Sequence, residues 1–304
     1  MARLHWDSDG LHWPHRERSR FVTVQGLCWH VQHWPGPSPK APLALLIHGT
    51  GAASHSWRDL APALNQRFAL LAMDLPGHAF THPLGSAAPP LSLPGMARAL
   101  ADLLAQLPFQ ADLVLGHSAG AAIALRMALS GAMEPRLLLG LNAALLPLGG
   151  LAGQLFSPVA KLMALTPWAP RLFARSAQAP AVLDRLLDST GSVIDEPGRA
   201  LYRMLVSHPD HVAGALGMMA NWDLDGLSSE LGQLKTPLDL IVGTRDLTVP
   251  PEQAERVLRL LPAGLQAQCL RLEGLGHLAH EEQPERVAQL IATRWDERCP
   301  ASGL

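Results

Sequence analysis

Gly116-His117-Ser118-Ala119-Gly120 is the stretch of sequence that decides the fold. It follows the apolar run 113–115 and precedes the apolar run 121–127, a context that predicts a buried strand turning sharply into a helix at the serine. A serine on so sharp a turn is strained, and flanking glycines let strand and helix pack closely around it. The Gly-x-Ser-x-Gly pattern is typical of a catalytic nucleophile, although a serine that merely caps a helix would fit the same five residues.

The composition indicates a folded globular chain and argues against several kinds of partner and site. With 304 residues and 48% hydrophobic side chains, the chain can bury a full core. The formal charge is −2 and no long run of Lys or Arg occurs, so nucleic acid is not an expected partner. Cys28, Cys269 and Cys299 lie far apart without CxxC spacing, which argues against a disulfide framework and a zinc site.

Two further features bear on where the protein acts. The N-terminus has no apolar segment of the kind found in secretory signals, so we expect a cytoplasmic protein. The most apolar run, residues 137–156, is interrupted by Asn142, Pro147, Gln154 and several glycines. It is therefore too broken for a membrane-spanning helix, while peripheral membrane contact stays open.

Strands and helices alternate through most of the chain, which predicts an α/β fold with a mostly parallel sheet. The expected strands cover residues 20–24, 27–31, 43–47, 68–73, 112–115, 136–141, 238–242 and 266–272, the first two as an antiparallel hairpin. The expected helices cover residues 56–64, 94–107, 119–129, 251–261 and 285–295. Between 146 and 225 the alternation stops and prolines punctuate helical fragments. We expect a core formed by residues 1–145 and 226–304, interrupted by a helical cap at 146–225.

An aspartate and a histidine follow the last two predicted strands, in the order that a serine nucleophile requires. A serine hydroxyl needs a base to take its proton, and a carboxylate to orient that base. Asp246 and His277 each stand at the end of a predicted strand, after Ser118 in the chain. Either could instead be a helix cap or a surface residue. Their common placement at strand ends favours a catalytic triad.

Two other positions were candidates for the acid. Asn142 ends a predicted strand at a place where an aspartate could serve, but an amide cannot carry the charge. Asp74 also follows a strand, yet it lies too early in the chain. We expect Asp74 to order its own turn through hydrogen bonds to nearby backbone amides.

The tetrahedral intermediate of acyl transfer needs two hydrogen-bond donors for its negative oxygen. One is expected from the backbone of Ala119, which follows the nucleophile, and the other from Thr50 in the stretch His48-Gly49-Thr50-Gly51. A plain glycine turn is the alternative interpretation of that stretch.

The sequence predicts no metal site and no cofactor. Fourteen histidines are present, and His277 and His280 have i, i+3 spacing, but no Cys or carboxylate completes a ligand pattern. Gly-x-Gly-x-x-Gly is absent, so nucleotide binding has no support. The expected ligand is a small apolar substrate. The side chains expected beside it are His117, next to the nucleophile, and Met218, Met219 and Trp222 in the inserted segment.

These motifs together resemble the α/β-hydrolase superfamily across essentially the whole chain: His48 to Gly51, Asp74-Leu75-Pro76-Gly77-His78, residues 116–120, Gly243-Thr244-Arg245-Asp246 and Gly276-His277. The resemblance implies a sheet of about eight strands flanked by helices. More narrowly, Trp13-Pro14-His15-Arg16, the run 76–81 and the run 145–150 are similar to the BchO family of magnesium-chelatase accessory proteins of bacteriochlorophyll biosynthesis. That similarity implies an association with magnesium insertion into protoporphyrin, without supplying a substrate.

Three hypotheses follow. The leading one is a serine hydrolase that acts on an apolar ester- or amide-like substrate through an acyl-enzyme. The second is a non-catalytic accessory protein that holds a tetrapyrrole or delivers it to magnesium chelatase. The third keeps the triad but transfers the acyl group to an alcohol, thiol or peroxide, as an acyltransferase or perhydrolase does.

Overall fold

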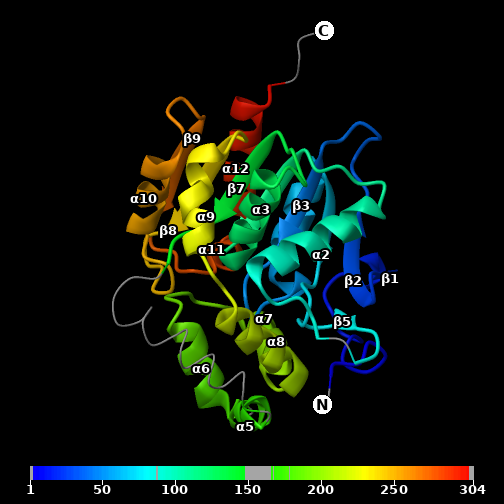
Figure 1. Ribbon diagram of the computed structural model, residues 1–304. Helices are drawn as coiled ribbons and strands as arrows, with labels where there is room; N and C mark the ends of the chain where they lie inside the picture. The colour runs from blue at the N-terminus through cyan, green and yellow to red at the C-terminus, as the bar shows by residue number, and fades with distance from the viewer. Residues whose placement is uncertain (1–2, 87, 148–165, 167, 178, 301–304) are drawn as a thin grey trace.

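A nine-stranded sheet lies at the centre of the part of the chain described by the computed structural model, residues 3–86, 88–147, 166, 168–177 and 179–300 (Figure 1). The strand order is β1-β2-β4-β3-β6-β7-β8-β9, with β5 paired to β2. All strands from β4 to β9 in this order are parallel, and β1 and β2 are antiparallel to their neighbours. The strands are β1 (Ser19–Val24), β2 (Leu27–Trp34), β3 (Leu43–Ile47), β4 (Ala69–Met73), β5 (His82–Pro83), β6 (Leu113–His117), β7 (Leu137–Leu141), β8 (Leu238–Gly243) and β9 (Ala267–Leu272).

The mostly parallel sheet confirms the predicted fold class. All eight expected strands are present, and the ninth, β5, has only two residues and no periodicity from which it could be predicted. β4, β6, β7 and β8 are buried along their whole length. Continuous apolar runs of this kind are expected where helices cover both faces of a parallel sheet.

Helices pack on both faces of the sheet. One apolar cluster joins the sheet to α2, α3, α9 and α10, and a second joins it to α1 and α12. The helices and 3-10 turns are η1 (Arg16–Arg18), η2 (Ser54–Trp57), α1 (Leu60–Asn65), α2 (Leu93–Ala105), α3 (Ala119–Leu129), α5 (Ala169–Ser176), α6 (Pro180–Asp188), α7 (Glu196–Val206), α8 (Pro209–Ala220), α9 (Asp225–Glu230), η3 (Leu231–Gln233), α10 (Glu252–Leu260), α11 (Ala279–Glu282) and α12 (Pro284–Arg298). The helix expected at 56–64 is instead the turn η2 followed by the short α1.

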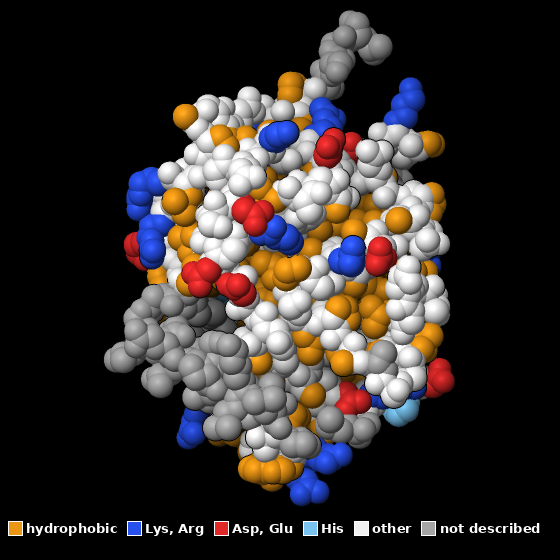
Figure 2. Space-filling view, in the orientation of Figure 1, with side chains coloured by type: hydrophobic (Ala, Val, Ile, Leu, Met, Phe, Trp, Pro, Cys, Tyr) orange, Lys and Arg blue, Asp and Glu red, His pale blue; other side chains and the backbone are white. Residues whose placement is uncertain are grey.

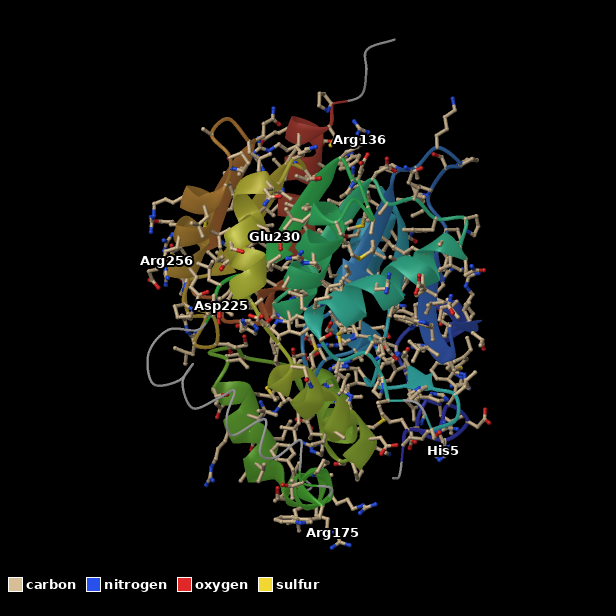
Figure 3. All side chains as sticks on the ribbon, in the orientation of Figure 1. His5, Arg136, Arg175, Asp225, Glu230 and Arg256 are labelled. Atoms are coloured by element: carbon tan, nitrogen blue, oxygen red, sulfur yellow. The ribbon has the colours of Figure 1, made fainter. Side chains whose placement is uncertain are left out.

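Ion pairs fasten two helices to this core. Arg126 of α3 donates to both carboxylate oxygens of Glu230, which Figure 3 labels on α9, at 2.9 and 3.1 Å. Asp239, fully buried inside β8, accepts from Arg294 Nε at 2.8 Å and Arg298 Nη2 at 2.7 Å. A charge inside a strand is costly unless paired, so these two arginines explain how β8 accommodates an aspartate.

The surface mixes apolar and charged side chains, as the positive mean hydropathy of +0.12 leads one to expect. On the face seen in Figure 2, hydrophobic side chains lie between charged ones over the helices in front of the sheet. Among the described residues, no helix combines the length and the apolar character needed to cross a membrane.

Helices α5 to α8 lie together below the sheet in Figure 1, between β7 and β8 in the chain, and are called the inserted helices from here on. Residues 148–165, 167 and 178 of the expected segment 146–225 lie outside the described residues, as does the second half of the run 145–150. The division into a core of 1–145 and 226–304 and a cap of 146–225 stays a prediction.

Candidate active site

Ser118 stands at the turn between β6 and α3 with φ 50° and ψ −118°. This is a strained conformation for a serine, and it is held by a hydrogen bond from Ser118 N to the Leu141 carbonyl at 3.0 Å. A Cβ on Gly116 would lie 2.4 Å from Ala121 Cα, and a Cβ on Gly120 would lie 2.1 Å from the Ile47 carbonyl oxygen. Only glycine therefore lets β6 and α3 approach this closely, as the sequence motif predicts.

Asp246 and His277 meet although 31 positions separate them in the chain. Asp246 follows β8, His277 follows β9, and the two parallel strands are neighbours in the sheet, so their loops emerge side by side. His277 Nδ1 donates to Asp246 Oδ2 at 2.8 Å, and both residues are about 5% exposed. With its proton on Nδ1, His277 keeps the lone pair on Nε2, the form that a general base requires.

The carboxylate of Asp246 is held by four donors. Oδ1 accepts from the backbone N–H groups of Thr248 and Val249, each at 2.8 Å, and Oδ2 accepts from His277 and from Asn142 Nδ2, the latter at 2.8 Å. A carboxylate surrounded only by donors is stabilised in its charged form. These four bonds fix the orientation of the carboxylate beside the histidine.

The Ser118 hydroxyl and the outer nitrogen of the His277 ring are the atoms that would react in a triad. Within the described part of the chain, neither Ser118 Oγ nor His277 Nε2 makes a hydrogen bond. Catalytic contacts of this kind are often long in proteins without substrate and shorten when substrate binds. Both residues border His117, whose ring lies 4.8 Å from that of His277 and whose Nε2 donates to the His277 carbonyl at 3.0 Å.

The loop after β3 lies directly against the serine. A Cβ on Gly49 would be 3.0 Å from Ser118 Cβ. Among the described residues, the backbone N–H groups of Thr50 and Ala119 have no acceptor. Two free backbone donors beside a serine are what an oxyanion hole consists of.

His48 keeps this loop in place. Its Nδ1 donates to the Gly49 carbonyl at 2.7 Å, and its Nε2 accepts from Leu75 N at 2.9 Å, so the loops after β3 and β4 are joined through one ring. Burial lowers the pKa of His48, although Asp74 opposes the shift. The neutral ring that results can donate and accept at the same time.

Other histidines close to the site are also buried. Burial lowers the pKa of His117 well below its usual range, and the neighbouring His280 and His277 lower it further. Burial likewise lowers the pKa of His280 to about 3 and that of His211 to about 4. These rings are neutral at physiological pH. Within the described residues, no group of three or more His, Cys, Asp or Glu side chains could hold a metal ion.

The side chains expected to line a pocket lie in different surroundings. Met218 is fully buried, and its sulfur accepts from the Thr50 hydroxyl at 3.3 Å, so it adjoins the loop after β3. Met219 packs on a cluster of Ala174, Val212 and Leu216 between α5 and α8. Trp222 packs against the apolar cluster on the α2 and α3 face of the sheet. Met218 thus bonds to Thr50, and the substrate-lining role of all three, and of His117, stays a prediction.

A second set of the same residue types lies on the other side of β3. Here His30 Nδ1 and Asp74 Oδ2 are 2.8 Å apart, and His30 Nε2 and Ser19 Oγ are 3.0 Å apart. Asp74 also accepts from Ser54 N at 2.8 Å and Phe80 N at 3.2 Å, as the sequence predicts for a turn-ordering aspartate. Burial alone would raise the pKa of the Asp74 carboxyl, but His30 and the Ser54 N–H outweigh it and hold that pKa well below its usual range.

Sequence reasoning missed three residues that contact the site. Asn142, considered only as a failed acid, donates to the acid and, at 3.3 Å, to the Gly276 carbonyl. Its place at the end of β7, next to β8, was the available signal. Thr190 and Ser192, from the loop between α6 and α7, accept hydrogen bonds from His277 N and Leu278 N. No pattern in the sequence distinguishes these two residues.

Comparisons with known proteins agree with the fold. A model of the alpha/beta hydrolase family matches residues 44–290. An alpha/beta hydrolase fold protein from Burkholderia ambifaria, 21% identical, superposes with a TM-score of 0.74 over 90% of this chain and 97% of that one. The epoxide hydrolase CorEH, also 21% identical, gives a TM-score of 0.74 over 92% and 98% of the two chains. At this identity both structures show the fold alone.

A curated relative confirms the narrower resemblance. The magnesium-chelatase 30 kDa subunit of Rhodobacter capsulatus is 38% identical over 279 residues, which cover 92% of this chain and 95% of that protein. The chain therefore belongs to the alpha/beta hydrolase family and is similar, over nearly its whole length, to a protein named as a magnesium-chelatase subunit.

Proposed function

We propose that this protein is a serine hydrolase that acts by acyl transfer on an apolar ester- or amide-like substrate. One observation carries the proposal: Asp246 orients His277 through Nδ1, and Ser118 occupies a strained turn beside two backbone N–H groups that have no acceptor among the described residues. A protein that only binds a ligand needs none of these features.

In the proposed mechanism, His277 Nε2 takes the proton of Ser118 as Oγ attacks the substrate carbonyl. Thr50 and Ala119 donate to the oxygen that becomes negative, and Asp246 stabilises the imidazolium. His277 then returns the proton to the leaving group, and water releases the acyl group by the same steps. From the inserted helices, Met218 accepts from the Thr50 hydroxyl at 3.3 Å, and its side chain suits an apolar acyl group.

A fluorophosphonate probe tests nucleophilicity without knowledge of the substrate. We expect covalent labelling of the wild-type chain that maps by mass spectrometry to Ser118 and disappears in Ser118→Ala. Ser130→Ala is the matched control, because the Ser130 hydroxyl only donates to the Met127 carbonyl in the last turn of α3. An unlabelled chain, or a label at another serine, would contradict the proposal.

The relative from Rhodobacter capsulatus favours a connection with magnesium chelatase, and we propose that the hydrolase acts in association with that enzyme. Complementation of a strain lacking its own copy separates catalysis from binding. If hydrolysis is the function, Ser118→Ala fails to restore pigment synthesis while Ser130→Ala restores it. Full restoration by Ser118→Ala would instead favour an accessory protein that holds a tetrapyrrole.

A further inference from the structure

The loop between α6 and α7 contacts His277 and both chain neighbours of Asp246. The carbonyl of Thr190 accepts from His277 N at 3.0 Å and from Leu247 N at 3.3 Å. Ser192 Oγ accepts from Leu278 N at 2.8 Å. One turn of backbone from the inserted helices therefore holds the residue after Asp246, His277 itself and the residue after His277.

This contact is too close for any other residue at its centre. Gly191 has φ +75°, and a Cβ there would lie 2.0 Å from the Arg245 carbonyl oxygen. A Cβ on Gly276 would lie 2.4 Å from the Gly191 carbonyl carbon. Two glycines thus let the loop at 190–193 pass between the acid loop and the base loop, with backbone against backbone on each side.

A second group of bonds joins the same elements. Glu282 of α11 accepts from Gly276 N at 2.7 Å with one oxygen and from Val193 N at 3.1 Å with the other. This carboxylate links the residue before His277 to the 190–193 loop. The backbone N–H groups on both sides of His277 are therefore held by side chains, Glu282 for Gly276 and Ser192 for Leu278, and Glu282 is itself bonded to the 190–193 loop.

A buried ionic cluster fastens α7 to the element that follows His277. Arg58 donates to Glu281 of α11 at 2.5 Å and to Asp195, the N-cap of α7, at 2.8 Å. Tyr202 of α7 donates to the other oxygen of Glu281 at 2.7 Å. Leu278 and Ala52, from the base loop and the loop after β3, pack in one apolar cluster with α6 and α7 side chains.

From these contacts, and resting on the proposed function, we infer that the 190–193 loop is a positioning element for the catalytic base. It fixes the backbone of His277 against the acid loop, so that the geometry of the Asp246–His277 pair depends on the docking of the inserted helices. Misplacement of a reacting group by about 1 Å costs on the order of 100-fold in rate. Displacement of the 190–193 loop should therefore lower activity without touching Ser118, Asp246 or His277.

Two variants and their matched controls test this inference. Ser192→Ala removes the acceptor of Leu278 N, and Ser189→Ala removes a hydroxyl of the same region that bonds only to the Leu186 carbonyl. Gly191→Ala places a Cβ against Arg245, and Gly264→Ala places one in open space at another glycine of positive φ, +91°. Ser192→Thr keeps a hydroxyl at this position and should therefore retain the labelling rate of the parent protein.

The first readout is the second-order rate of fluorophosphonate labelling against pH. We expect Ser192→Ala to lower the rate about tenfold, the equivalent of one hydrogen bond, and Gly191→Ala about 100-fold. Both should move the apparent pKa of the rate profile. The two controls and Ser192→Thr should match the parent, a pattern that a general loss of stability would not produce.

The second readout does not depend on the serine. The downfield proton resonance of the His277 Nδ1–H bound to Asp246 should broaden or shift in Ser192→Ala and Gly191→Ala, and persist in the controls. If it is unchanged in both variants, the inference is overturned, whatever the labelling shows. If it changes while the parent is never labelled at Ser118, the proposed function fails and the positioning of His277 by the 190–193 loop stands.

Discussion

Ser118, His277 and Asp246 share their residue types with Ser19, His30 and Asp74, and in each set the aspartate oxygen lies 2.8 Å from the histidine Nδ1. The second set is the more completely bonded, since His30 Nε2 also lies 3.0 Å from its serine. By hydrogen bonds among the three side chains alone, Ser19 would be the better candidate nucleophile.

The surroundings of the two serines differ. Ser19 begins β1 with extended backbone at φ −83° and ψ 142°, and its oxygen already accepts from Gln32 Nε2 at 3.2 Å. The ring of His30 is enclosed by Trp6, Phe21 and Phe80, with ring centres 4.9 to 5.5 Å away. Ser118 instead occupies a strained turn beside two unpaired N–H groups. The comparison teaches that backbone strain and free donors, rather than the three contacts, identify a site for acyl transfer.

Replacing each serine in turn should give the largest difference in activity between the two sets. Ser118→Ala should lower kcat for an activated ester by roughly 10⁵- to 10⁶-fold, because no nucleophile remains for His277 to activate. Ser19→Ala should keep the parent kcat per folded molecule, since that hydroxyl is already bonded to His30 and Gln32. Steady-state kinetics with a chromogenic ester measures both. Comparable losses in the two variants would contradict the distinction.

Replacing the two aspartates should have different effects: the change at Asp246 should lower activity, and the change at Asp74 should lower stability. Asp246→Asn should reduce kcat on the order of 10⁴-fold, because an amide no longer selects the productive histidine tautomer. Asp74→Asn breaks a fully buried pair and should lower the free energy of unfolding by about 3–5 kcal/mol. Denaturant unfolding and ester kinetics on both variants are the measurements. A more stable Asp74→Asn, or an active Asp246→Asn, would run against the assignment.

Acidification should act first through buried histidines that pack around the two sets. His211 and His280 have folded pKa values of about 4 and about 3, below the unfolded value of about 6.5, so the unfolded state binds more protons in between. Their contribution to stability is present above pH 6.5 and is lost as pH falls toward these values. His280→Phe keeps the ring contacts with Trp57 and His117 and should make the unfolding free energy less dependent on pH between 6.5 and 3. If the dependence of the unfolding free energy on pH were unchanged in His280→Phe, His280 would not be held neutral in the folded protein.

The second set should respond only at lower pH, with the smallest effect. The folded pKa of Asp74 lies below the ordinary aspartate value of about 3.9, so its contribution is present above pH 4 and declines as pH falls further. Asp74→Asn should therefore have a flatter stability curve than the parent below pH 4 and a parallel one above it. Chemical denaturation at a series of pH values measures the unfolding free energy below and above pH 4. A difference in slope confined to pH 5–7 would be inconsistent with a charged Asp74.

Much of the fold followed from local pattern. Short, mostly apolar segments predict β3, β6, β7 and β8, and glycines at 116 and 120 predict the close turn at Ser118, because each feature acts over a few neighbouring residues. The parallel arrangement then implies that loops after neighbouring strands emerge together. Ser118, Asp246 and His277 could be chosen on that basis, and their catalytic role stays a prediction for the experiments above.

What the sequence by itself determined is therefore the alternation of strands and helices, the strained turn and the chain order of the three candidate residues. Only the tertiary structure decided that Asn142 supports the acid, that Arg294 and Arg298 neutralise Asp239, and that the 190–193 loop holds His277. It also placed Ser19, His30 and Asp74 together, through the pairing of β2 with both β1 and β4. The reason is physical: apart from the contact of Ser19 with His30, these contacts join side chains 44 to 104 positions apart, or backbone groups common to every residue type, so no local pattern encodes them.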